Sequence, residues 1–70
     1  MSLSNAKVGH TGQVKTVLGS EKLRRFLFSL GCSEGEEITL ISILASNYIV
    51  SIKDSRYAID KKMAQLIELS

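Results

Sequence analysis

The sequence predicts a small, mainly β protein with one or two short helices, folded as a barrel with a helix inserted after the first strand. Three observations predict this class. Short runs rich in β-branched and aromatic residues recur along the 70-residue chain, one run with helical spacing interrupts them early, and glycines or short polar pairs separate them. Closing such strands into a barrel removes the exposed edges of an open sheet, and the helix would cover one end.

The first strand is expected at about Gly12 to Leu18. Gly9 and Gly12 bracket the sequence GHTG ahead of QVKTVL, and both glycines are predicted to serve a tight turn into this strand. Gly19 and Ser20 then stop it.

A helix of about ten residues is predicted next. Ser20 is a good N-cap, Glu21 places negative charge in the first turn, and Gly31 falls where a left-handed C-cap favours glycine. The apolar residues between them recur at helical spacing, and they are Leu23, Phe26, Leu27 and Leu30. A helix this short is marginal on its own, so we expect its apolar face to pack on the strands.

The rest of the chain predicts a meander of strands. Gly35 opens a strand within EITLISILAS, and SNYIVSI follows with apolar residues at alternate positions. Asp54 and Ser55 are the predicted turn before the strand RYAID. Asp60 can cap one helical turn that runs to Ala64, and LIEL ends the chain as a short strand.

Nothing in the sequence divides the chain, so residues 1–70 are predicted to form a single domain. The charge-free run from Ile38 to Ile52 is 15 residues long, shorter than the roughly 20 apolar residues of a membrane helix, and indicates two strands around a turn. The first residues lack the basic segment and apolar core of a signal peptide. A single cysteine, Cys32, excludes an internal disulfide, which fits a reducing cytoplasm.

The net charge gives little support for nucleic-acid binding, because nine Lys and Arg against seven Asp and Glu leave only +2. Lys22, Arg24 and Arg25 form a basic helix surface, which is either a solvated face or a docking surface for an acidic partner. Phe28 falls away from the apolar stripe of the same helix. Such a ring either fills a groove beside the barrel or makes a contact patch.

No set of residues predicts catalysis, a metal site or a cofactor. His10 is the only histidine and has only Thr11 nearby, so no triad can be assembled. Cys32 is expected to be a small buried hydrophobe. The glutamates of SEGEE lack the ladder of ligands found in a calcium loop and are predicted to form a solvated turn; they are Glu34, Glu36 and Glu37.

Taken in order, these motifs resemble the FeoA family. That family has an opening leucine, a G-x-x-G-x-V strand entry, a helix of pattern L-R-x-x-L-x-x-L-G, a later glycine and an A-x-x-I-x-V/L ending. The matching residues are Leu3, Gly9, Gly12, Val14, Leu23, Arg24, Leu27, Leu30, Gly31, Gly35, Ala64, Ile67 and Leu69. Two positions depart from the pattern: Glu34 replaces a usual proline, and Phe26 stands where the family often has a basic residue.

The resemblance implies an SH3-like β-barrel with an inserted helix, without enzymatic activity. It further implies a cytoplasmic accessory or regulatory protein of bacterial ferrous iron uptake, which binds the cytoplasmic GTP-binding region of the FeoB transporter and is thereby recruited to the inner face of the membrane. The residues predicted for this contact are Lys22, Arg24, Arg25 and Phe28, and those predicted for turns and caps are Gly9, Gly12, Ser20, Gly31 and Gly35.

Two alternatives remain beside this hypothesis. One is a small module that binds Fe2+ or Zn2+, with ligands shared across an oligomer, because one chain offers few nitrogen or sulfur ligands. The other, less favoured, is an RNA-binding barrel, for which only Tyr48 and Tyr57 could stack on bases. We expect no nucleic acid partner and no direct membrane insertion. A free strand edge or the apolar helix flank would allow a homo-oligomer.

Overall fold

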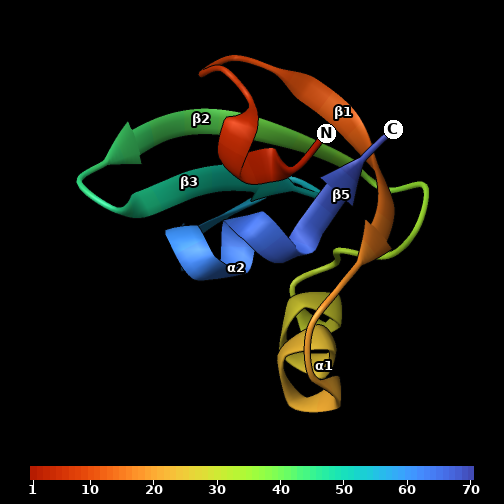
Figure 1. Ribbon diagram of the computed structural model, residues 1–70. Helices are drawn as coiled ribbons and strands as arrows, with labels where there is room; N and C mark the ends of the chain where they lie inside the picture. The colour runs from red at the N-terminus through yellow and green to blue at the C-terminus, as the bar shows by residue number, and fades with distance from the viewer.

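Five antiparallel strands wrap around one apolar core in the computed structural model, which describes residues 1–70 (Figure 1). The strand order in the sheet is β4-β3-β2-β1-β5. The strands are β1 (Thr11–Val17), β2 (Glu37–Leu44), β3 (Asn47–Ile52), β4 (Ser55–Asp60) and β5 (Ile67–Leu69). The helical elements are a 3₁₀ turn η1 (Leu3–Asn5) and the helices α1 (Glu21–Ser29) and α2 (Lys61–Leu66). The predicted mainly β class with a helix after the first strand is confirmed.

The sheet curls because β1 changes partner halfway along its length. Its first residues pair with β2, with Thr11 opposite Thr39, and its last residues pair with β5, with Val17 opposite Ile67. A register shift after Val14 marks the change. Such an irregularity bends a strand and increases its twist, so the two ends of the sheet approach each other around the core.

The charge-free run forms the β2–β3 hairpin that was expected. Its register shifts between Leu40 and Ser42, and this bulge breaks the alternation of buried residues in β2. Beyond the bulge Ile43 and Leu44 are exposed, at the free end of the hairpin seen in Figure 1. Only some of the apolar residues of this run are therefore buried in the core.

The turn between β3 and β4 is one residue earlier than expected. Ile52 pairs with Ser55, so Lys53 and Asp54 are the two turn residues and Ser55 already belongs to β4. Both turn residues have positive φ, 49° at Lys53 and 66° at Asp54. Positive φ at both positions is typical of the tight hairpin turn whose twist matches the flanking strands.

Every element contributes to one core, and its buried residues include no charged side chain. Tyr48 is the largest of them, and its hydroxyl donates a hydrogen bond of 3.0 Å to the carbonyl of Ser4. This bond satisfies the one polar side-chain atom that Tyr48 brings into the core. The fifteen buried residues are Leu3, Ala6, Val14, Val17, Leu27, Cys32, Ile38, Leu40, Tyr48, Val50, Ile52, Ile59, Ala64, Ile67 and Leu69.

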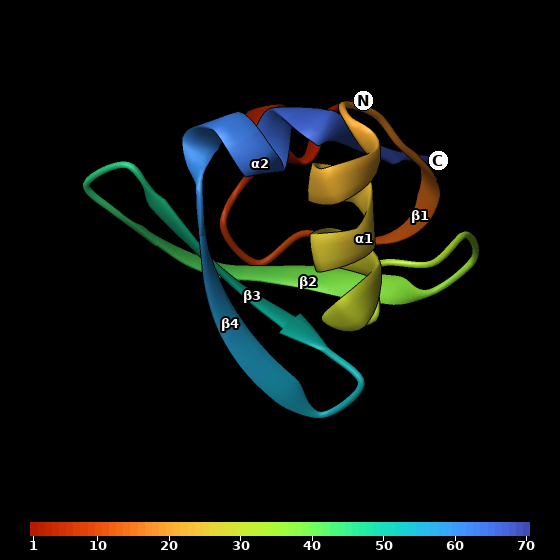
Figure 2. The same ribbon diagram turned by 90° about the horizontal axis from the view of Figure 1, so that it is seen from below.

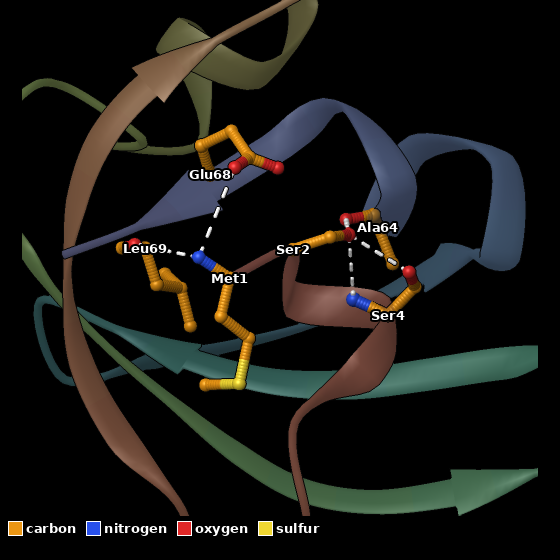
Figure 3. Close-up of polar contacts among 6 residues, drawn as sticks. All are labelled: Met1, Ser2, Ser4, Ala64, Glu68 and Leu69. Carbon is orange, nitrogen blue, oxygen red and sulfur yellow. Dashed lines mark hydrogen bonds and ion pairs between the residues drawn. The ribbon is translucent and has the colours of Figure 1, made fainter.

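The first residues of the chain lie against α2 and β5, an arrangement that the sequence did not predict (Figure 3). The amino group of Met1 donates to the carbonyl of Leu69 at 3.2 Å and lies 3.8 Å from the Glu68 carboxylate. The hydroxyl of Ser2 donates to the carbonyl of Ala64 at 3.2 Å. These contacts fix η1 against the end of the sheet, where Leu3 enters the core.

Helix α1 lies across one open end of the curled sheet, as the views from the side and from below both show (Figures 1 and 2). The expectation that its apolar face packs on the strands is only partly correct. Leu27 is fully buried and Leu30 is half-buried against the core, but Leu23 and Phe26 are exposed. In Figure 1 the last turn of α1 is nearest the sheet and its first turn is farthest from it, which leaves Leu23 exposed. Phe26 is exposed because it lies about 100° around the helix from its neighbour Leu27, which enters the core.

The two glycines before β1 have different roles. Gly9 lies in the turn and has a φ of 94°, a conformation that glycine adopts without strain. Gly12 is the second residue of β1, close to where this strand was expected to begin. A Cβ on Gly12 would lie 3.2 Å from Nε2 of His10 and 3.5 Å from Cδ1 of Leu69, so this position leaves space for the imidazole.

Candidate partner-binding surface

Both ends of α1 are fixed by local hydrogen bonds. At its start the Ser20 hydroxyl accepts the backbone N–H of Leu23 at 3.3 Å. At its end the N–H of Cys32 donates to the carbonyl of Leu27 at 3.1 Å, and the N–H of Gly31 donates to Phe28 at 2.9 Å. These two bonds form a Schellman motif, with Gly31 in the left-handed conformation at a φ of 106°. The short helix is therefore held in one position although most of its surface is exposed.

The four residues predicted to contact a partner all lie on α1, and all are exposed. The guanidinium of Arg24 lies 5.6 Å from the centre of the Phe28 ring, a cation–π geometry. Arg25 forms an ion pair of 2.6 Å with Glu21, one turn earlier. Lys22 forms no ion pair within the chain. The structure thus brings Arg24 and Phe28 together, leaves Lys22 free, and partly neutralises Arg25.

The other side of α1 carries exposed apolar residues that sequence reasoning assigned to the core. Leu23 is 38% exposed and Phe26 is 45% exposed. Leu18, in the connection that leads into the helix, is 49% exposed. Helical spacing places Leu23 and Phe26 on the same stripe as the buried Leu27, so periodicity alone could not distinguish them. The tilt of the helix away from the sheet exposes Leu23, and the rotation of the helix about its axis directs Leu27 into the core and leaves Phe26 outside.

Neither cleft of the molecule fits an apolar small molecule, because no hydrophobic residue lines either one. One cleft lies at the start of α2, and its lining residues are Ser46, Asp60, Lys61, Lys62 and Gln65. The other lies beside the β3–β4 turn, where Lys53 pairs with Glu36 at 3.4 Å. Its lining residues are Glu36, Glu37, Thr39, Ser51, Lys53 and Asp54.

The residues weighed for catalysis or metal binding are dispersed. Nε2 of His10 is buried without a hydrogen-bond partner, beside Gly12. Burial raises the pKa of the Cys32 thiol from 9.0 to about 11, so the thiol is protonated at neutral pH. The structure brings together no group of three or more His, Cys, Asp or Glu side chains that could hold a metal ion.

The aromatic residues considered for RNA stacking are also not free. Tyr48 is buried, and Tyr57 is half-buried against the core. Base stacking needs an exposed ring face, so the sheet presents no stacking surface from these two tyrosines. Neither helix has the length and apolar character needed to cross a bilayer.

Comparison with known families gives a match over the whole chain. A model of the FeoA domain matches residues 1–70. The chain belongs to the FeoA family. FeoA proteins are non-enzymatic accessory domains associated with ferrous iron transport, which confirms the family predicted from the sequence motifs. Among curated proteins, none matches this FeoA chain by sequence.

Solved FeoA structures share the fold. The crystal structure of an iron uptake regulatory protein, FeoA, is 28% identical, with a TM-score of 0.92 over 100% of this chain and 93% of its own. Iron(II) transport protein A from Clostridium thermocellum is 27% identical, with a TM-score of 0.91 over 99% of this chain and 44% of its own. FeoA from Stenotrophomonas maltophilia, an SH3 domain protein solved with zinc, is 21% identical, with a TM-score of 0.88 over 100% of this chain and 89% of its own. The expected SH3-like fold is confirmed.

Proposed function

We propose that this FeoA protein is an accessory or regulatory component of bacterial ferrous iron uptake that binds the cytoplasmic part of a FeoB-type transporter. It would act in the cytoplasm and reach the inner face of the membrane through that partner. Family membership supports the iron-transport context. The single observation that supports a docking role is α1, which extends from the barrel with both its charged and its apolar side chains exposed.

The contact is proposed to involve the four residues of the charged side, Lys22, Arg24, Arg25 and Phe28. Exposed charges on a rigid helix contribute mainly to association rate and to choice of partner. The Arg24–Phe28 pair adds a planar surface on which a carboxylate or a ring of the partner can rest. A partner region with acidic residues fits this side.

The test is biolayer interferometry of this protein against the purified cytoplasmic region of FeoB from the same genome, with and without GTP. Saturable binding is expected, and a change with GTP would assign a regulatory role. The variant Arg24→Glu/Arg25→Glu is expected to bind at least about 10-fold more weakly, with an almost unchanged melting temperature because both residues are exposed.

A matched control is Lys15→Glu/Arg56→Glu, which changes net charge equally at exposed strand positions. Equal weakening by both double variants would indicate a general charge effect and reject the α1 contact. No binding of the wild-type protein at high micromolar concentration would reject the proposal. Heat released on anaerobic titration with Fe(II) or Zn(II) would then favour direct metal binding.

A further inference from the structure

The apolar side of α1 is the least explained surface of the molecule. Leu23 and Phe26 lie three residues apart, so they are neighbours on one side of the helix. Together with Leu18 they are more than one third exposed, although large apolar side chains of small proteins are usually placed in the core. The helix needs Leu27 and Leu30 for attachment to the barrel, but attachment does not require Leu23 or Phe26.

A basic residue borders this apolar side on one flank. On a helix, Lys22 lies next to Phe26, four residues later, whereas Arg24 lies beyond the buried Leu27 and its guanidinium is over Phe28 on the charged side. Neither basic residue has an ion-pair partner within the chain, whereas the one carboxylate of the helix, Glu21, is already paired with Arg25. The free surface is therefore apolar at Leu23 and Phe26 and positive along the edge formed by Lys22.

We propose that this apolar side of α1 binds an acidic amphipathic helix of the partner's cytoplasmic region, a proposal that rests on the proposed function above. The partner helix lies along α1, places apolar residues on Leu23 and Phe26, and directs carboxylates toward Lys22. Two helices packed side by side interlock their side chains in this manner. Charge complementarity at this edge fixes which segment binds and in which direction.

The chemistry of α1 favours a helix over an extended peptide. An extended peptide gains affinity from main-chain hydrogen bonds to an open strand edge. The backbone N–H and C=O groups along the side of a helix are already paired within it, so α1 offers no such bonds. Side chains alone must supply the contact, and an amphipathic helix presents its side chains as a matching stripe.

A second copy of this chain fits the surface less well. Two copies of α1 packed through Leu23 and Phe26 would place Lys22 of each copy at the edge of the contact, with no free carboxylate of α1 to pair with it. Like charges across an interface oppose binding. A lipid surface also fits less well, because only Leu23 and Phe26 would enter it, and membrane binding by an amphipathic helix increases with the apolar area that it buries.

The first experiment compares two double variants for binding to the same purified FeoB cytoplasmic region. Leu23→Ser/Phe26→Ser is expected to weaken binding by roughly 100-fold, as expected for two central apolar contacts. The control, Ile43→Ser/Leu44→Ser, removes two comparably exposed apolar residues from the tip of the β2–β3 hairpin and is expected to bind like the wild type. Circular dichroism melting of both variants checks that each remains folded.

The second experiment identifies the partner segment. A photo-crosslinking benzoylphenylalanine in place of Phe26 is expected to label a segment whose carboxylates recur every three or four residues. Reversing those carboxylates to lysine is expected to restore at least about 10-fold of the affinity lost by Lys22→Glu. A labelled segment without acidic residues, or a failure of this charge exchange, would overturn the proposal.

Failure of the helix contact and failure of the proposed function give different results. No binding by the wild-type protein overturns the proposed function and this inference together. Wild-type binding that persists in Leu23→Ser/Phe26→Ser overturns only the inference. Flotation with phosphatidylglycerol–phosphatidylethanolamine vesicles that depends on Leu23 and Phe26 would overturn it in favour of a lipid surface, and a concentration-dependent dimer that the same variant abolishes would overturn it in favour of a second copy.

Discussion

At the scale of single residues, Gly31 shows how local conformation and packing act on one position. Its φ of 106° is strained for any residue with a Cβ. A Cβ there would also lie 2.9 Å from Cγ2 of Ile52, a residue of the core. Gly35 differs, because its φ of 85° is similarly restrictive but its surroundings are open. Substitution at Gly35 therefore meets backbone strain alone, whereas substitution at Gly31 meets backbone strain and steric overlap.

We predict that Gly31→Ala destabilises the protein more than Gly35→Ala does. The left-handed conformation should cost about 1–2 kcal/mol of unfolding free energy in each variant. Overlap with Ile52 should add roughly 1–3 kcal/mol to the cost of Gly31→Ala alone. Urea denaturation of both variants measures the difference. Equal losses would mean that Ile52 moves away at no cost.

The buried thiol of Cys32 makes a prediction about pH. Burial raises its pKa in the folded protein from 9.0 to about 11, so the unfolded chain loses this proton at lower pH than the folded protein does. The contribution of Cys32 to stability should be constant below pH 9 and should fall by roughly 2–3 kcal/mol as the pH rises to 11. The measurement compares the wild type with Cys32→Ala, so that pH effects common to both proteins cancel. Parallel stability curves for the two proteins would contradict the prediction.

At the scale of elements, the β2–β3 hairpin and α1 both leave apolar residues in solvent. In the hairpin the cause is the bulge after Leu40, which ends the regular alternation of buried residues. In α1 the causes are the tilt of the helix, which leaves Leu23 outside, and its rotation about its axis, which directs Leu27 but not Phe26 into the core. Caps fix both ends of α1, and a two-residue turn between Leu44 and Asn47 closes the hairpin.

The β2–β3 turn provides a test at this scale. Ala45 occupies its first position with a φ of 55°, a conformation that favours glycine in a two-residue hairpin turn. Ala45→Gly should therefore raise the unfolding free energy by about 0.5–1 kcal/mol. The same change at Ala58, an exposed residue of β4 without positive φ, should lower it by about 0.5–1 kcal/mol. Thermal melts that shift in the same direction for both variants would contradict this.

At the scale of the whole molecule, the two ends of the chain complete the barrel together. β5 pairs with β1, and an isolated bridge joins Ser2 to Glu68, so the first and last residues lie side by side (Figure 3). A chain of this length buries only about 60% of the surface that its unfolded form exposes, so the loss of one core residue removes a large share of the stability. Leu3 belongs to that core although it lies in a three-residue 3₁₀ turn near the start of the sequence.

We predict that Leu3→Ala destabilises the protein by about 2–5 kcal/mol, the range for a leucine removed from a packed core. Val8→Ala, a few residues later and 58% exposed, should cost under about 0.5 kcal/mol. Chemical denaturation of both variants measures the two costs. A small effect of Leu3→Ala would mean that η1 is not needed for folding.

The sequence by itself determined the elements and the family. Ser20, Glu21 and Gly31 defined α1 because caps and left-handed glycines are local features. Alternating apolar residues defined β3, because strand periodicity is also local. The same local motifs, in their order along the chain, indicated the FeoA family, which the domain match confirms.

Only the tertiary structure decided which apolar residues are buried and which surface is free. Leu23 and Leu27 share one helical stripe, yet the tilt of α1 buries one and exposes the other. Gly12 faces Leu69 of β5, and η1, which carries Leu3, contacts β5, although β5 is at the other end of the sequence. Burial is a property of contacts between distant segments, and helical or strand periodicity records only the direction in which each side chain points.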